Sequence, residues 1–296
     1  MKSRRSFIKH SSYVAAGSLL LPLGCTQKSQ ESKEPVVMED PGLATATKKS
    51  MGVQVYSARD ALKEDFAGTM GKLADIGFEY IEAFGLEVDG KIYGMTAQEY
   101  RTIVEDTGMK MLSSHCSYFK AEDGQALLEA AVAAGVTYGN VAYLAEELRG
   151  DYFKIAENLN KAGEMFKEAG VQLGYHNHAF EFEMQGDEVA LEIMLKETDP
   201  ELVTFQADLY WVTKGGADPM ELLQKYPGRF SSFHVKDAAE DLEQTTVGTG
   251  IVDFESIFGI KDTAGMKHYF VEDERTDDPF GNLTKAFEYL NQADFT

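Results

Sequence analysis

Eight short runs rich in β-branched and aromatic residues alternate along this chain with stretches whose apolar residues recur every three or four positions. The runs cover residues 52–56, 80–84, 110–115, 138–142, 171–176, 203–208, 230–236 and 268–272. The stretches with helical spacing cover residues 61–76, 97–106, 126–134, 152–169, 189–196, 220–226 and 282–290. This alternation predicts a parallel sheet whose strands are joined by helices.

Glycine follows four of the helical stretches, where a left-handed residue typically ends a helix. These glycines are Gly77, Gly108, Gly135 and Gly170. The length of residues 51–296 and the eight strand signals predict a single closed (β/α)8 TIM barrel. A doubly wound open sheet is the alternative. Residues 53–59 lack the Gly-x-Gly-x-x-Gly pattern that follows the first strand of a dinucleotide-binding sheet, so the barrel is favoured.

The first 24 residues differ in composition from the rest. Residues 3–9 read Ser-Arg-Arg-Ser-Phe-Ile-Lys and precede an apolar stretch that is too short for an ordinary transmembrane helix. Residues 1–24 resemble a twin-arginine export signal, which predicts a periplasmic or envelope-anchored protein. The ending also resembles a lipoprotein cleavage box with Cys25 as the lipidated residue, although Pro22 stands where leucine is usual. Residues 25–50 are polar and aperiodic, which predicts a disordered tether.

The remainder of the chain is strongly acidic. The formal net charge is −21, and the first 24 residues hold four basic residues and no acidic one, so the rest carries 24 basic against 49 acidic side chains. Such a body would repel a phosphate backbone, which argues against a nucleic-acid partner. Two cysteines, Cys25 and Cys116, are too few for a disulfide framework. The sequence leaves the oligomeric state open.

Ionisable residues gather where the predicted strands end. In a barrel, all these ends face one mouth, where active sites are built. The strand-end residues are Gln54, Tyr56, Glu82, Ser114, His115, Tyr143, His176, His178, Asp208, His234, Lys236, Glu272 and Glu274. For each one alone, a hydrogen-bonded structural role is the better interpretation, and His268, at the start of its strand, is interpreted as structural. As a set, two imidazoles and two carboxylates suit one divalent Mn, Co, Fe or Zn ion.

The strand-end motifs resemble those of the xylose-isomerase-like TIM barrels, the sugar phosphate isomerases/epimerases, from about residue 52 to 290. They include Tyr-His-Asn-His at the fifth strand, Phe-Gln-Ala-Asp-x-x-Trp at the sixth, Phe-His-Val-Lys-Asp at the seventh and Val-Glu-Asp-Glu at the eighth. The resemblance implies that the metal ligands are His176, Asp208, His234 and Glu272. Many epimerases of the family have glutamate in place of His176. A metal-bound imidazole cannot act as a base, which argues against their symmetric two-glutamate mechanism.

The expected chemistry is removal of a proton beside a carbonyl group through a metal-bound enediolate. Candidates for the catalytic groups are Glu272, Glu82, His115 and Lys236, the last paired with Asp237. Tyr56, His178 and Trp211 are the predicted substrate-binding residues. The first hypothesis is a sugar isomerase or epimerase. The alternatives are a 3-keto-glycoside lyase and a non-catalytic, exported sugar-binding lipoprotein. Since Lys236 is the only basic residue predicted at a strand end, the substrate is expected to be an unphosphorylated sugar or keto-glycoside.

Overall fold

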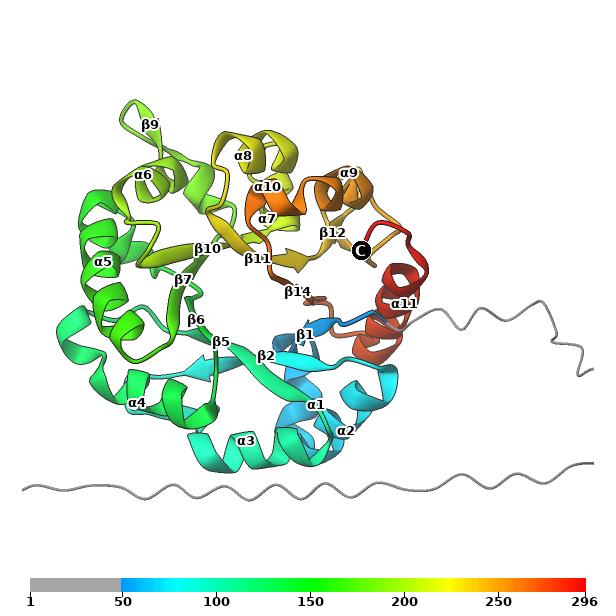
Figure 1. The fold of residues 1–296 in the computed structure, drawn as a ribbon. Coiled ribbons are helices and arrows are strands. Elements are labelled where there is room, and N and C mark those ends of the chain that lie inside the picture. The colour runs from blue at the N-terminus through cyan, green and yellow to red at the C-terminus, as the bar shows by residue number, and fades with distance from the viewer. Residues whose placement is uncertain (1–48) are drawn as a thin grey trace, which may run out of the picture. The chain divides into compact units, whose positions relative to one another are not determined.

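The structure is a computed structural model that describes residues 49–296. Eight parallel strands form a closed barrel, in which β1 pairs with both β14 and β2, and helices surround the barrel (Figure 1). The strands are β1 (Gly52–Gln54), β2 (Tyr80–Leu86), β5 (Lys110–Cys116), β6 (Tyr138–Val141), β7 (Gln172–His176), β10 (Val203–Asp208), β11 (Phe230–Val235) and β14 (His268–Val271). The predicted (β/α)8 TIM barrel and all eight predicted strands are confirmed.

The helices also follow the predicted order. Helices overlapping the predicted stretches are α1 (Arg59–Glu64), α2 (Phe66–Ile76), α3 (Ala97–Asp106), α4 (Gln125–Ala134), α5 (Tyr152–Glu168), α6 (Ala190–Glu197), α8 (Pro219–Lys225) and α11 (Pro279–Gln292). Three short helices were not predicted, because four to six residues are too few to display a helical period. They are α7 (Leu209–Lys214), α9 (Phe254–Gly259) and α10 (Lys261–Ala264).

One predicted helix, 61–76, is wrong as a single element, because Asp65 divides it into α1 and α2. The backbone of Asp65 is extended, and its Oδ1 accepts a hydrogen bond from the Gly68 amide at 2.9 Å. Asp65 therefore ends one helix and caps the next. The four predicted glycine stops are confirmed, with φ angles of 123°, 83°, 74° and 78° at Gly77, Gly108, Gly135 and Gly170.

The connections that leave the C-terminal ends of the strands carry small additional elements. They are the hairpins β3 (Lys91–Ile92) with β4 (Met95–Thr96), β8 (Met184–Gln185) with β9 (Glu188–Val189) and β12 (Asp237–Ala238) with β13 (Gln244–Thr245). The 3-10 turns are η1 (Val55–Ala58), η2 (Ala121–Asp123), η3 (Glu146–Leu148) and η4 (Phe180–Phe182). These elements enlarge the connections at the end of the barrel where active sites of this architecture lie.

Apolar side chains fill the layer between the helices and the barrel wall. Helix α5, for example, buries Ile155, Leu159 and Phe166. Inside the barrel, Gly174 on β7 gives Asn140 on β6 the room it needs. A Cβ atom on Gly174 would lie 1.9 Å from Asn140 Oδ1, so any larger residue there would displace that side chain. The barrel interior thus admits polar side chains beneath its mouth.

The predicted signal, Cys25 and most of the predicted tether lie outside the described residues. Lys49, the first described residue, already contacts the barrel, because its Nζ donates to the Leu290 carbonyl of α11 at 3.2 Å. Met51 is already fully buried. Among residues 49–296, no helix combines the length and the hydropathy that a membrane span requires.

Candidate active site and metal centre

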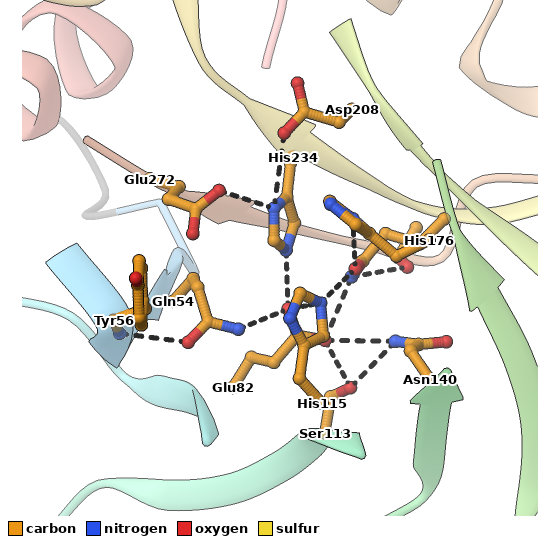
Figure 2. Close-up of polar contacts among 12 residues, drawn as sticks. Gln54, Tyr56, Glu82, Ser113, His115, Asn140, His176, Asp208, His234 and Glu272 are labelled. Atoms are coloured by element: carbon orange, nitrogen blue, oxygen red, sulfur yellow. Dashed lines mark hydrogen bonds and ion pairs between the residues drawn. The ribbon is translucent and has the colours of Figure 1, made fainter. Parts of the chain in front are cut away.

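Glu82 lies in the middle of β2, fully buried inside the barrel, and both its carboxylate oxygens are shared by several donors (Figure 2). Oε1 accepts from Gln54 Nε2 at 2.9 Å and from His234 Nε2 at 2.5 Å. It also lies 3.1 Å from His115 Nε2, which forms its hydrogen bond with Gln206 Oε1 at 2.8 Å. Oε2 accepts from Ser113 Oγ at 2.5 Å, Asn140 Nδ2 at 3.0 Å and Gln206 Nε2 at 2.9 Å. A carboxylate so fully occupied holds its neighbours in place.

Burial alone would raise the pKa of Glu82, but the attraction of His115 and His234 outweighs it and holds that pKa well below its usual range. Glu82 therefore stays ionised. It was expected at the strand end as a candidate base. The structure places it beneath the mouth, where it contacts His115 but does not itself line the cavity described below, which disfavours that role.

Asp208, His234 and Glu272 bring one ligand atom each to within 4.8 Å of one another. His234 Nδ1 lies 3.0 Å from Glu272 Oε2 and 3.7 Å from Asp208 Oδ2. Asp208 Oδ1 accepts from the Trp211 amide and so caps α7, whereas its buried Oδ2 has no hydrogen-bond partner among the described residues. A buried, unsatisfied carboxylate oxygen is costly. A divalent cation would satisfy it, so this group fits a metal ion with nitrogen and oxygen ligands.

His176, the fourth predicted ligand, belongs to a second group with His115 and His234. The centroid of the His176 ring lies 4.6 Å from that of His234 and 4.7 Å from that of His115. Burial and the three neighbouring histidines lower the pKa of His176 well below its usual value, which keeps its ring neutral. His234 thus connects the two groups, and a neutral His176 retains the lone pair that a metal ligand needs.

Lys236 is fully buried next to the acidic group. Its Nζ lies 3.2 Å from Glu272 Oε2 and 3.7 Å from Asp208 Oδ2, and it also contacts Glu274 Oε1. Burial alone would lower the pKa of Lys236, but the attraction of the three carboxylates raises it. Lys236 therefore remains an ammonium group, which makes it a source of positive charge and unsuitable as a base.

Two carboxylates differ from expectation. Asp237 was a candidate partner of Lys236 in catalysis, but its oxygens accept hydrogen bonds from the amides of Ala238, Gly248, Gly250 and Val252. It therefore anchors the loop after β11.

Glu274 is a strand-end residue to which the sequence assigns no role, yet its half-buried side chain lines the cavity at the mouth. Burial and the charge of Glu272 raise the pKa of Glu274, which brings it closer to that of a useful base.

A cavity of about 430 Å³ opens over these groups, which is within the size range of small-molecule sites. Its lining includes Tyr56, His115, His176, His178, Glu272 and Glu274, but not the predicted substrate-binding residue Trp211. We call it the inner cavity. No lysine or arginine side chain lines it among the described residues.

The two histidines of the Tyr-His-Asn-His motif have different environments. Strand β7 ends at His176, and the following Asn177 accepts from the Asp208 amide at 3.1 Å, which links β7 to β10. His178 lies in the connection after the strand, and its ring is nearly parallel to that of Phe180, 5.7 Å away. Its buried Nδ1 has no partner among the described residues. His178 belongs to neither candidate ligand group, although its ring centroid lies 4.9 Å from that of His176, and it is available to a substrate.

A closed parallel barrel with ionisable groups at the C-terminal ends of its strands belongs to the TIM-barrel class. Residues 70–293 match the xylose isomerase-like TIM barrel family, and the chain belongs to that family.

Its similarity to individual proteins is more distant. The chain is 30% identical in sequence to a sugar phosphate isomerase/epimerase from Parabacteroides distasonis, whose crystal structure it matches with a TM-score of 0.76 over 87% of this chain and 98% of that one. It is 25% identical over 161 residues to an inosose dehydratase from Geobacillus thermodenitrificans, covering 47% of this chain and 53% of that protein. An inosose dehydratase from Clostridium perfringens is 29% identical over 160 residues, covering 47% of this chain and 53% of that protein. These matches span about half the length of the curated relatives.

Proposed function

We propose that the protein is a divalent-metal-dependent enzyme that removes the proton from the carbon beside a keto group of an unphosphorylated sugar. The observation that carries this proposal is the meeting of Asp208, His234 and Glu272 around an unsatisfied Asp208 oxygen. The adjacent inner cavity has a further carboxylate, Glu274, in its lining. Such a site combines a candidate metal centre with a candidate base.

Asp208, His234 and Glu272 would hold the metal ion, with His176 as a further ligand. When bound, the ion would act as a Lewis acid that stabilises negative charge on the oxygens of a keto sugar. Glu82 would orient the His234 ring through the hydrogen bond that it accepts from His234 Nε2. The fixed charge of Lys236 would offset part of the repulsion among the carboxylates.

Glu274 is the proposed base. Its carboxylate would take the proton, the C–H electron pair would form a C=C bond to the carbonyl carbon, and the carbonyl π electrons would move to oxygen. Return of the proton to another carbon or to the other face gives isomerisation or epimerisation. Expulsion of an oxygen substituent from the next carbon, with protonation of the departing oxygen, gives elimination.

Elimination is the second candidate outcome, and two observations favour it. An epimerase needs a proton acceptor on each face of the substrate, whereas His176, if bound to a metal, cannot accept a proton. In addition, the inosose dehydratases to which the chain is similar carry the name of a lyase activity. Elimination needs a base on one face only.

An unphosphorylated substrate is supported by the lining of the inner cavity, which contains no lysine or arginine among the described residues. Export through the predicted signal would bring the enzyme into contact with free and glycosidic sugars.

Product analysis of the metal-loaded protein on free ketoses and on 3-keto-glycosides tests the proposal. Isomerised ketose supports an isomerase or epimerase, and a released aglycone supports a lyase. Binding of both sugars without any conversion contradicts enzymatic function and supports the sugar-binding alternative. The Glu274→Gln variant serves as the control for contaminating activity, because it should bind metal without turnover.

A further inference from the structure

A second hollow of about 510 Å³ adjoins the inner cavity. The two share Tyr143 and His178 as lining residues. Beyond these residues the second hollow is lined by Arg149, Phe180 and Trp211, among others. We call it the outer hollow. A substrate bound over the candidate metal centre can therefore extend past His178 without leaving the protein surface.

Four rings form the wall of the outer hollow. The ring centroid of His178 lies 5.7 Å from that of Phe180 and 5.3 Å from that of Trp211, and Tyr143 meets His178 edge-on at 5.4 Å. Arg149 fixes part of this wall, because its guanidinium lies 3.5 Å from the centre of the Phe180 ring and donates to Tyr143 Oη at 2.6 Å. Such a set of aromatic faces suits a ring with an apolar face.

Two polar atoms in this wall lack partners. His178 Nδ1 and Trp211 Nε1 are buried and form no hydrogen bond within residues 49–296. A buried polar group without a partner is destabilising. Because both residues line the outer hollow, a small movement of either ring would let it bond to a hydroxyl group of a bound sugar, which both donates and accepts.

The basic residues at the outer hollow are already engaged. Lys214 Nζ contacts Tyr210 Oη at 2.9 Å and Glu243 Oε1 at 3.2 Å. Arg149 donates to Tyr143 and to the Leu144 carbonyl, and the carboxylate of Glu183 also lines the hollow. This arrangement favours an uncharged ligand over a phosphate or carboxylate.

We propose that the outer hollow binds the second ring of a glycoside while the first, keto-bearing ring occupies the inner cavity. This inference rests on the proposed function and narrows its substrate class to glycosides whose second group is an uncharged sugar or aromatic ring. That ring is the group which elimination would release.

The test compares the affinities of methyl and phenyl 3-keto-glucosides, and of a 3-keto-disaccharide, for metal-loaded Glu274→Gln protein. Turnover is expected to stop in that variant, so equilibrium binding is measured. The phenyl glycoside or the disaccharide should bind on the order of tenfold more tightly than the methyl glycoside. Trp211 is the only tryptophan of the chain. Its fluorescence should therefore change with either two-ring ligand and stay unchanged with the methyl glycoside.

Variants that carry a second substitution show whether the additional affinity comes from the outer hollow. Adding Trp211→Ala or Phe180→Ala should reduce the affinity ratio to about one, whereas Trp211→Phe should preserve most of it. Phe153→Ala, which removes an exposed aromatic ring from α5, is the matched control and should leave the ratio unchanged. Comparison of the phenyl glycoside with the disaccharide shows whether the outer hollow prefers an aromatic ring or a second sugar.

Equal affinities for the one-ring and two-ring ligands would overturn the inference. So would a Trp211→Ala variant that loses the same affinity for the one-ring ligand as for the two-ring ligands. In either case, binding of the methyl glycoside would leave the proposed function standing. Failure of all three ligands to bind, together with no turnover by the wild-type protein, would overturn both proposals.

Discussion

Glu82 Oε1 lies 2.5 Å from His234 Nε2, so a carboxylate in the barrel interior fixes a ring whose other nitrogen faces the mouth. An ionised carboxylate only accepts hydrogen bonds, so Nε2 carries the hydrogen. The other nitrogen, Nδ1, lies 3.0 Å from Glu272 Oε2 and 3.7 Å from Asp208 Oδ2, where a bound cation would take the place of a second hydrogen. Glu82 therefore acts on the candidate metal centre through His234, without touching the cavity.

Replacing Glu82 by Gln should weaken metal binding about 10- to 100-fold, because His234 loses the anion that orients it. Calorimetric titration with Mn²⁺ or Zn²⁺ measures this change, and circular dichroism checks that the barrel remains folded. Glu79→Gln, on the exposed residue just before β2, is the control and should leave the affinity unchanged. Equal metal affinity in folded Glu82→Gln protein would show that this contact is only structural.

Two neighbouring carboxylates should separate metal binding from proton transfer. Glu272→Gln should bind less metal, because Glu272 belongs to the candidate ligand group. Glu274→Gln should keep its metal and lose roughly 10²- to 10⁴-fold in kcat, the usual contribution of a general base. Metal content and steady-state rates decide between these roles. Full metal content in both variants, with normal turnover by Glu274→Gln, would refute the assignment.

The buried Glu181 should make stability depend on pH. Burial raises its pKa to about 7, from an ordinary value of 4.5. Between these values the folded protein holds a proton that the unfolded chain has released. The contribution of Glu181 to stability is therefore complete below pH 4.5 and is lost as pH rises through 7, a change of about 3 kcal/mol.

Denaturant unfolding between pH 4.5 and 8 measures this loss as the difference between the wild-type protein and Glu181→Gln. The variant should lack this part of the pH dependence, whereas Glu183→Gln, on an exposed neighbour, should behave like the wild type. Parallel pH profiles for the wild type and Glu181→Gln would show that Glu181 is ionised throughout the range.

The barrel could be predicted from the sequence because its signals are local. Each strand is a short run of apolar residues, and the glycines at 77, 108, 135 and 170 end helices by backbone conformation. Asp208, His234 and Glu272 could be selected because the topology gathers strand ends at one mouth. Because every strand ends at the same mouth, residues far apart in the sequence can be predicted to lie together.

The layer around Glu82 could not be predicted in the same way. It joins Glu82 to His234 across 152 positions, and Gln54, Asn140 and Gln206 in this layer resemble ordinary polar residues within strands. The sequence does contain one indication of this layer, because several of the apolar strand runs include a single polar residue. Helix α7 was missed because Asp208 both ends β10 and caps the helix, with no loop between them.

Removal of residues 1–48 should leave the melting temperature unchanged within about 2 °C, because their composition predicts an export signal and a tether that contribute nothing to the barrel. Met51→Ala in the shortened chain should lower stability by about 2–5 kcal/mol, since Met51 is fully buried. Calorimetry of the full chain and both variants measures the shifts. A large loss on removing residues 1–48 alone would show that this segment stabilises the barrel.

The fate of the hydrogen beside the carbonyl tests the central claim most directly. The metal-loaded enzyme is given a keto sugar or 3-keto-glycoside labelled with deuterium at that carbon, and the rate and the label are followed together. We predict a primary isotope effect or exchange of the label with solvent, because Glu274 is proposed to remove this hydrogen as a proton. Turnover with no isotope effect and full retention of deuterium at the labelled carbon would contradict proton abstraction.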